Sequence, residues 1–332
     1  MARKAGVSIG TVSRVLNGGN KENWKSTVRR AAQVRRIAQE MGYRPSWRGR
    51  AFASGKTHTI GLIHQAFDPL QLGEAWHDIL RELIDQLRAR NYGVQFLPVG
   101  EEKEDLLACR AVISERRFDG CMVSKYLTPE IEEALRETDM PAVMINAEAD
   151  ASWSQVQLDD RGGAMAMTRH LIQQGHRRIA FMTDETGTMR HFSLRRRLEG
   201  VYAAMAEAGL GQPIEAHRKE ISAALEELMA LSAPPTAVVT YHDTTAVTLL
   251  QACWRKGIGV PTDLSVATFN DSTATRMSIP PLTTMRLPGA IVARRAATQL
   301  LERMAQGPEW VPERLILPEE LIVRESTGPA AK

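Results

Sequence analysis

The sequence has few of the residues that build disulfide or metal frameworks. Cys109, Cys121 and Cys253 are the only cysteines among 332 residues, they lie far apart, and no histidine accompanies them at metal-ligand spacing. We therefore expect three reduced, buried thiols and neither a disulfide nor a metal site. Apolar runs of the ~20 residues that span a bilayer are missing, as is a secretory signal with a basic start and an apolar core. These absences indicate a cytoplasmic protein without a membrane partner.

Short catalytic motifs are also missing. No G-x-G-x-x-G follows the first predicted strand, no Walker loop occurs, no G-x-S-x-G follows a strand as a nucleophile elbow requires, and the eight histidines are dispersed. We expect no catalytic residues and no cofactor, which argues against an enzyme.

Charge is present but unevenly distributed. Residues 1–56 hold thirteen Lys and Arg against two Glu, a net +11, whereas the whole chain carries +3, which leaves −8 for the remainder. A basic segment attached to an acidic body is typical of proteins that bind nucleic acid. Helix-spaced apolar residues in this segment argue against a disordered tail.

The basic segment has the pattern of a small helical unit. Val12, Val15 and Leu16 follow the i, i+3, i+4 spacing of one buried helix face, and Ser8 stands where the N-cap would be. A second basic helix is predicted over 26–41, closed by a glycine and a proline. Short helices joined by a turn predict a helix-turn-helix head.

From Thr59 onward, buried strands alternate with amphipathic helices. The first block runs from "TIGLIH" to "AVMIN", and a second begins after Asp159 and Asp160, which we expect to cap the following helix. Repeated βα units predict an α/β fold with parallel sheets covered by helices, and two blocks predict two lobes. Individually, these patterns leave the function open.

Six segments together resemble the LacI/GalR family of bacterial transcription regulators, in the family's order. They are "ARKAGVSIGTVSRVLNG", "MGYRPSWRGRAFASGKTHTIGLI", "HLIQQGHRRIAFMT", "RRRLEGVYAAM", "GIGVPTDLSVATFND" and "PPLTTMR". The resemblance implies a helix-turn-helix head joined to a two-lobed core that is like a periplasmic binding protein, with Rossmann-like subdomains and three crossovers.

The resemblance also implies a division of the chain. The head would occupy 1–45, the hinge 46–56 and the effector-binding and dimerisation core 57–328. Within the core, the N-terminal lobe would comprise about 58–158 and 287–317. The C-terminal lobe would comprise about 159–285 and 318–328.

For the head, the resemblance implies two groups of DNA contacts. Base reading would fall to the outward face of the helix after Ser8, and Arg14 there can pair bidentately with guanine. Phosphate contacts would fix the register without reading sequence. The base-reading set is Ile9, Gly10 and Arg14, and the phosphate set is Ser8, Thr11, Ser13 and Asn17.

The hinge departs from the family pattern of an Asn, an Ala-rich helix and a wedging Leu. Here Gly49 should weaken the hinge helix, and Phe52 stands in the wedge position, from which it would either enter the minor groove or pack on the core. Arg48 and Arg50 could follow the narrow groove.

For the effector, the resemblance implies a cleft between the lobes at the carboxyl ends of the strands. The implied contacts are Gln65, Phe67, Asp68, Asn146, Arg197, His242 and Asn270. His242 replaces a common Asn, and Asn270 replaces an Asp that often holds sugar hydroxyls. These departures favour a sugar or a sugar acid as the effector.

We therefore interpret the chain as a regulator, with repression as its expected mode, that binds a pseudo-palindromic operator in double-stranded DNA as a homodimer under the control of a small effector. The alternative is a sugar-binding protein without a DNA role. Met1 falls where the family usually has an internal Val, so we expect the native start to lie a few residues upstream.

Overall fold

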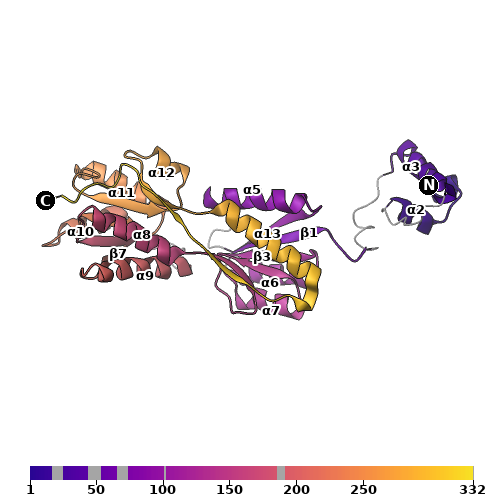
Figure 1. Ribbon diagram of the computed structural model, residues 1–332, viewed down its shortest axis with the longest axis horizontal. Coiled ribbons are helices and arrows are strands. Elements are labelled where there is room, and N and C mark those ends of the chain that lie inside the picture. The colour runs from indigo at the N-terminus through magenta and orange to yellow at the C-terminus, as the bar shows by residue number, and fades with distance from the viewer. Residues whose placement is uncertain (17–24, 44–53, 66–73, 101, 185–190, 332) are drawn as a thin grey trace.

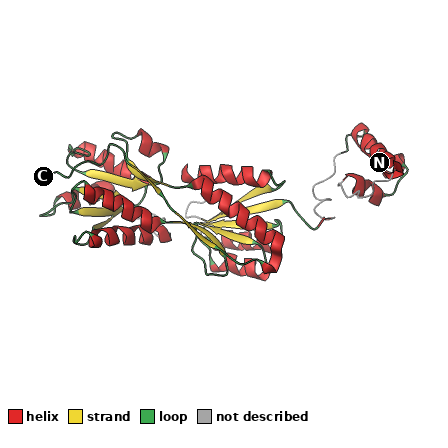
Figure 2. Ribbon diagram, in the orientation of Figure 1, coloured by secondary structure: helices red, strands yellow, loops and turns green. Residues whose placement is uncertain are grey.

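The computed structural model describes residues 1–16, 25–43, 54–65, 74–100, 102–184 and 191–331. Figure 1 shows a helical head at one end of the molecule and two α/β lobes in line beyond it. Within each lobe, helices enclose a sheet (Figure 2). The fold class expected from the sequence is thus confirmed.

The head consists of three helices around a small core. Its helices are α1 (Ala2–Ala5), α2 (Ile9–Leu16) and α3 (Lys25–Glu40). Val12 and Val15 of α2 are buried against Val34 and Ile37 of α3, so the predicted apolar stripe is confirmed. Packing of this face, rather than local propensity, holds so short a helix in place.

The N-terminal lobe is built on a six-stranded parallel sheet in the order β11-β5-β4-β3-β1-β2. Its elements are β1 (Thr59–Gln65), α5 (Glu74–Arg88), β2 (Gly93–Val99), α6 (Lys103–Ser114), β3 (Gly120–Ser124), α7 (Pro129–Glu137), β4 (Ala142–Ile145), β5 (Ser154–Leu158), α13 (Gly289–Gln306), the 3₁₀ turn η2 (Gly307–Glu309) and β11 (Arg314–Leu317).

Both faces of this sheet are covered, which explains why β3 has no polar alternation. Met122 packs toward α5 and α13, whereas Cys121 and Val123 pack toward α6 and α7. Successive side chains of a strand point to opposite faces, so a strand buried on both faces must be apolar throughout.

The C-terminal lobe repeats this plan with strand order β12-β10-β9-β8-β6-β7, and only β12 pairs antiparallel. Its elements are α8 (Asp160–Gln173), β6 (Ile179–Thr183), α9 (Phe192–Glu207), β7 (Ile214–His217), α10 (Ile221–Met229), β8 (Ala237–Thr240), α11 (Asp243–Lys256), β9 (Ser265–Phe269), α12 (Thr273–Met277), β10 (Thr283–Arg286) and β12 (Glu320–Ile322). One core lies under α10 and α11, and the other lies under α8 and α9.

The chain passes between the two sheets three times: from β5 to α8, from β10 to α13, and from β11 to β12. Each lobe is therefore assembled from separated segments of sequence.

The first crossover contains the two aspartates that are expected to cap α8. Asp159 accepts a hydrogen bond from the Gly162 amide at 2.9 Å, which confirms it as the cap of α8. The same expectation for Asp160 is wrong, because its carboxylate binds Arg197 instead.

All three cysteines are free and buried. Among the described residues, no group of histidine, cysteine and acidic side chains is arranged to hold a metal ion. In the same part of the chain, no helix has the length and apolar character to cross a bilayer.

Candidate functional sites in the head and between the lobes

Helix α2 presents an exposed polar face opposite its buried valines. Ser8 caps the helix, because its Oγ accepts a hydrogen bond from the Thr11 amide at 3.1 Å. Ile9 is 80% exposed, and Gly10 and Arg14 are exposed beside it. The three residues predicted to read bases therefore share one open surface.

Gly10 makes no close packing contact with the described residues. A Cβ added at Gly10 would meet only the Ser8 Oγ, at an ordinary 3.8 Å. Glycine weakens a helix interior by about 1 kcal/mol relative to alanine. Glycine at this position therefore lowers the stability of the helix and relieves no clash within the protein. This combination indicates that a binding partner approaches the helix closely at Gly10.

We expect Gly10→Ala to raise the head's free energy of unfolding by about 1 kcal/mol while weakening its binding to specific DNA. Urea unfolding followed by circular dichroism measures the first effect, and fluorescence anisotropy with labelled DNA measures the second. A stabilised variant with unchanged DNA affinity would show that the glycine serves neither packing nor close approach.

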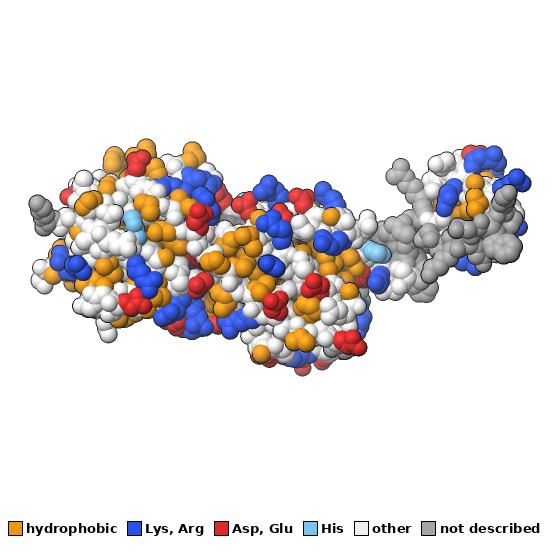
Figure 3. Space-filling model, viewed as in Figure 1, with side chains coloured by type: hydrophobic (Ala, Val, Ile, Leu, Met, Phe, Trp, Pro, Cys, Tyr) orange, Lys and Arg blue, Asp and Glu red, His pale blue; other side chains and the backbone are white. Residues whose placement is uncertain are grey.

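The described surface of the head also carries exposed arginines and lysines on α1 and α3. Figure 3 shows basic side chains on the described surface of the head. They include Arg3, Lys4, Arg29, Arg30, Arg35 and Arg36. An open face within a basic surface has the chemistry of a groove-binding helix.

Several predicted contacts lie outside the described residues. They are Asn17, the hinge residues Arg48, Gly49, Arg50 and Phe52, and the effector-loop residues Phe67 and Asp68. Gln65 ends strand β1. Thr11 and Ser13 are partly exposed on α2.

Four non-glycine residues with positive φ mark the carboxyl ends of strands. Lys125 (φ 70°) follows β3 and Asn146 (φ 47°) follows β4 in one lobe, while Asn270 (φ 85°) and Asp271 (φ 49°) follow β9 in the other. Such backbone costs free energy and collects at functional sites. In open α/β sheets, ligands bind at this edge.

A chain of hydrogen bonds starts at Asn146 and crosses between the lobes. His191 Nε2 donates to the Asn146 carbonyl at 3.0 Å, and the His191 Nδ1 accepts from the Ser193 amide. The Ser193 hydroxyl then contacts the Tyr241 hydroxyl at 2.9 Å. Burial lowers the pKa of His191 to about 4, so the imidazole is neutral near pH 7, as these two roles require.

The side-chain oxygen of Asn146 has no hydrogen-bond partner among the described residues. This Oδ1 atom is buried. Buried polar atoms are nearly always paired, so an orphan at a strand end indicates a place for a ligand atom.

Arg197, predicted to hold effector, lies inside the C-terminal lobe. Its Nε donates to Asp160 at 2.8 Å, and its Nη1 donates to the Tyr241 carbonyl at 2.7 Å. The guanidinium also lies 4.0 Å from the ring centroid of Phe269. Burial raises the pKa of Asp160, and the adjacent guanidinium opposes this shift. Effector contact by Arg197 stays a prediction.

His242 and Asn270 lie at neighbouring strand ends. His242 caps α11 through Nδ1, and its Nε2 is 3.4 Å from an oxygen of Asp184. Asn270 donates to Asp243 at 3.4 Å. The two predicted residues and two acidic side chains thus form a polar group at the carboxyl edge of the second sheet.

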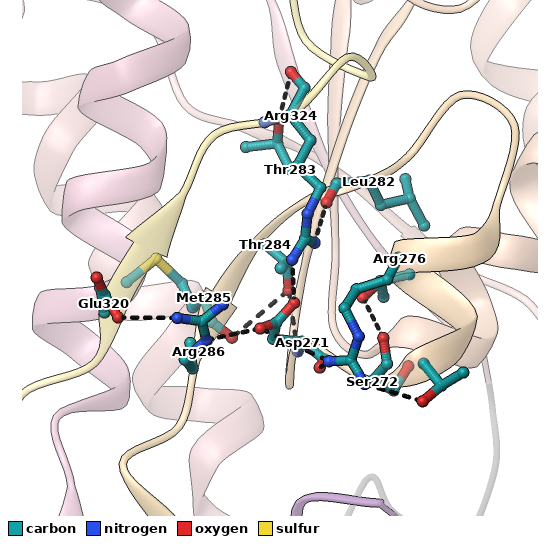
Figure 4. A network of polar contacts seen from close by, with 12 residues as sticks. Asp271, Ser272, Arg276, Leu282, Thr283, Thr284, Met285, Arg286, Glu320 and Arg324 are labelled. Carbon is teal, nitrogen blue, oxygen red and sulfur yellow. Dashed lines mark hydrogen bonds and ion pairs between the residues drawn. The ribbon is translucent and has the colours of Figure 1, made fainter.

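Next to this group, Asp271 binds three elements together (Figure 4). Its carboxylate accepts from Arg286, at the end of β10, and from Arg324, beyond β12, and Arg276 of α12 lies 3.8 Å away. Burial opposes ionisation, but the hydrogen bonds from Arg324 and Arg286 hold the pKa of Asp271 below its usual value. Through these ion pairs Asp271 fixes the end of β10 to α12 and to the segment after β12.

A cavity of about 860 Å³ opens between the lobes on the side of His191. Its lining comes from both lobes: Leu106, Lys125, Tyr126, Leu127, Thr128, Pro129 and Glu148 from the first, and His191, Phe192, Leu194, Arg195, Leu198 and His217 from the second. The predicted effector residues Asn146, Arg197, His242 and Asn270 are not in this lining. Sequence reasoning missed Lys125, although it directly follows a fully buried strand.

Comparison with known proteins agrees with this architecture. Residues 1–46 match the model of bacterial regulatory proteins of the lacI family. Residues 168–327 match the model of a periplasmic binding protein-like domain.

Solved structures resemble the whole chain. The transcriptional regulator CelR in complex with cellobiose is 26% identical, with a TM-score of 0.72 and 98% coverage of both chains. The lac repressor dimer bound to operator has a TM-score of 0.82 over 98% of this chain and 97% of its own, and at 21% identity it supports the fold alone.

Curated relatives match over nearly the full length. The ribose operon repressor of Escherichia coli K12 is 29% identical over 338 residues, covering 98% of both chains. The HTH-type transcriptional regulator GalR of E. coli K12 is 30% identical over 313 residues, covering 90% of this chain and 86% of GalR. The chain therefore belongs to the lacI family of bacterial regulatory proteins, which are DNA-binding transcriptional regulators and not enzymes.

Proposed function

We propose that this regulator is a cytoplasmic homodimeric repressor that binds a pseudo-palindromic operator and responds to a sugar or a sugar acid. In this proposal, residues 1–45 form the head, 46–56 the hinge and 57–328 the core. The open face of α2, whose Gly10 packs against nothing beyond ordinary contact, is the observation that carries it.

The DNA part rests on the shape and charge of the head. Helix α2 would lie in the major groove with Ile9, Gly10 and Arg14 toward the bases, and nearby hydroxyls would contact phosphates. Two heads from a dimer would read two half-sites, so the operator would share the dimer's two-fold symmetry.

The effector part rests on the gap between the lobes. The relative CelR was solved with cellobiose, and another relative is named for a ribose operon. Polar groups gather at the facing strand ends, and a cavity of about 860 Å³ has room for a sugar-sized molecule.

Communication between the sites requires that effector bind one lobe arrangement more tightly than another. Besides the His191–Asn146 bond, Arg195 and Glu148 form an ion pair of 2.9 Å across the cleft, and Glu74 of α5 contacts the Thr273 amide. An effector that changes how these contacts close would alter the spacing of the two heads.

The proposal is tested by titrating the full chain onto the palindrome upstream of its own operon, followed by fluorescence anisotropy. We expect binding to that palindrome to exceed binding to scrambled DNA by at least about 10³-fold, and to weaken steeply with salt. Release by a sugar or its acid would support the regulatory part. Equal affinity for both DNAs would overturn the DNA part.

The dimer is expected to use an apolar surface on the C-terminal lobe. Trp254 of α11 is 82% exposed, Met277 at the end of α12 is 76% exposed, and Ile279 after α12 is 93% exposed. Exposed apolar side chains in this number mark an association surface.

We expect Ile279→Glu to raise the dimer dissociation constant at least about tenfold, because a carboxylate would lose its hydration in the interface. Sedimentation velocity measures the change. Val311 is 77% exposed on the other lobe, so Val311→Glu is the matched control and should leave the dimer intact. Equal effects of the two substitutions would place the interface elsewhere.

A further inference from the structure

The lining of the cavity between the lobes includes one cationic side chain, Lys125, that no described residue neutralises. The Lys125 amide donates to the Ile145 carbonyl at 3.3 Å, but its ammonium group makes no hydrogen bond or ion pair with any described residue. Burial lowers the pKa of this ammonium group. Its positive φ of 70° adds backbone strain at the end of β3. Burial of a cation that has no partner among the described residues costs free energy, so a partly buried ammonium group of this kind favours an anionic ligand.

The other basic groups around the cavity are already occupied. Arg195 pairs with Glu148 at 2.9 Å and with Glu199 at 3.2 Å. His191 is neutral near pH 7 and donates to a backbone carbonyl. His217 pairs with Glu215 through Nε2 at 2.8 Å. Lys125 is therefore the cation available to a ligand.

Two further polar atoms of the lining have no partner among the described residues. They are the Thr128 Oγ1 and the His217 Nδ1, both buried. These atoms suit the hydroxyls of a sugar, because each can exchange one hydrogen bond with an O–H group. Aromatic rings of Tyr126, His191 and Phe192 stand together along the lining, with centroids 5.7 Å and 4.5 Å apart in turn. They offer the apolar surface on which a sugar ring can rest.

We propose that the effector is a polyhydroxylated anion whose carboxylate or phosphate pairs with Lys125 in this cavity. The inference rests on the proposed effector-controlled function and names the chemical class of its ligand. It also places the anchoring contact at Lys125, at the end of β3, a residue that is not among the contacts expected from the sequence.

The test compares matched ligands by isothermal titration calorimetry on the full chain. Glucose, galactose and ribose are each measured against the corresponding acid (glucuronate, galacturonate, ribonate) and the terminal phosphate ester. We expect at least one acid or phosphate to bind 100-fold or more tightly than its neutral parent, with an affinity that falls as salt rises. The acid and phosphate arms identify which anion the site prefers.

Variants locate the effect. Lys125→Gln should weaken binding of the preferred anion by about 10- to 100-fold, since a charge-assisted hydrogen bond is lost. Lys103→Gln is the matched control, because Lys103 is exposed at the start of α6 on the same lobe and should leave the affinity unchanged. Thermal unfolding confirms that each variant is folded. If Lys125→Gln does not fold, the salt dependence of anion binding by the unmodified chain tests the proposal.

Each outcome has a distinct meaning. Tight binding of a neutral sugar without preference for its acid or phosphate overturns the anionic effector but preserves the proposed sugar response. An anion preference that survives Lys125→Gln overturns the role of Lys125. If none of these ligands binds, the sugar response and the anionic effector both fail, while the operator titration still judges the DNA function.

Discussion

Arg14→Ala is expected to weaken binding to the specific operator by about 10- to 100-fold, because a bidentate arginine–guanine contact contributes roughly 1–3 kcal/mol. Arg14 is exposed on α2 beside Gly10, and Val12 and Val15 hold the opposite face in the core, so loss of the side chain should not unfold the head. Fluorescence anisotropy with operator and scrambled DNA, both at one salt concentration, measures the change.

Two companion variants separate base reading from charge. Arg14→Lys keeps the charge but loses the two-pronged donor, so it should lose specific affinity and retain non-specific affinity. Arg117→Ala removes an exposed arginine of the N-terminal lobe that pairs with Glu115, and should change neither. If Arg14→Ala lowers binding to operator and scrambled DNA equally, Arg14 contacts phosphate and does not read a base.

Asp160→Ala is expected to lower the free energy of unfolding by about 3–5 kcal/mol, the range seen when one member of a buried ion pair is removed. The side chains of Asp160 and Arg197 are 1% and 6% exposed. Without the carboxylate, the guanidinium would stay in the interior against Phe269 and would keep its hydrogen bond to the Tyr241 carbonyl. Buried Glu319 would be the remaining acidic side chain that acts on it. Urea unfolding at pH 7 measures the loss.

The matched comparison is an exposed ion pair in the same lobe. Arg169 and Glu207 pair at 2.6 Å with side chains 51% and 52% exposed, so Glu207→Ala should cost no more than about 1 kcal/mol. The double variant Asp160→Ala with Arg197→Met should recover part of the loss, because the guanidinium is then no longer left in the interior without its carboxylate. A cost for Asp160→Ala equal to that of Glu207→Ala would contradict a buried, charge-paired site.

The sequence predicts the strands that are continuous apolar runs and misses β5, which is largely polar. β3 and β4 are continuous apolar runs and were expected. β5 has the sequence SQVQL, yet Ser154, Gln155 and Gln157 are 3%, 2% and 3% exposed. Gln157 is tolerated there because its amide donates to the Ala147 carbonyl and its Oε1 accepts from Arg314 of β11. A polar strand whose partner comes more than 150 residues later gives no local signal.

Of the two candidate sites, the sequence predicts the DNA-facing surface of α2 but not the cavity between the lobes. The face of α2 is a local feature, since helical spacing alone places Gly10 and Arg14 opposite Val12 and Val15. The cavity depends on contacts between distant segments, such as His191 with Asn146. Only the fold shows that the Arg197 guanidinium binds Asp160 and the Tyr241 carbonyl, whereas the Lys125 ammonium group has no partner among the described residues. Burial and pairing are properties of the assembled lobes.

The three crossovers also constrain how the chain is made. The core of the first lobe includes Val292, Ala296 and Leu300 of α13, and its edge strand β11 pairs with β5. During synthesis, these segments emerge only after nearly all of the second lobe. The part of this face that α13 covers must therefore stay exposed on the ribosome while the second lobe folds, although α5 already covers the rest. This exposed surface is where a chaperone would be needed.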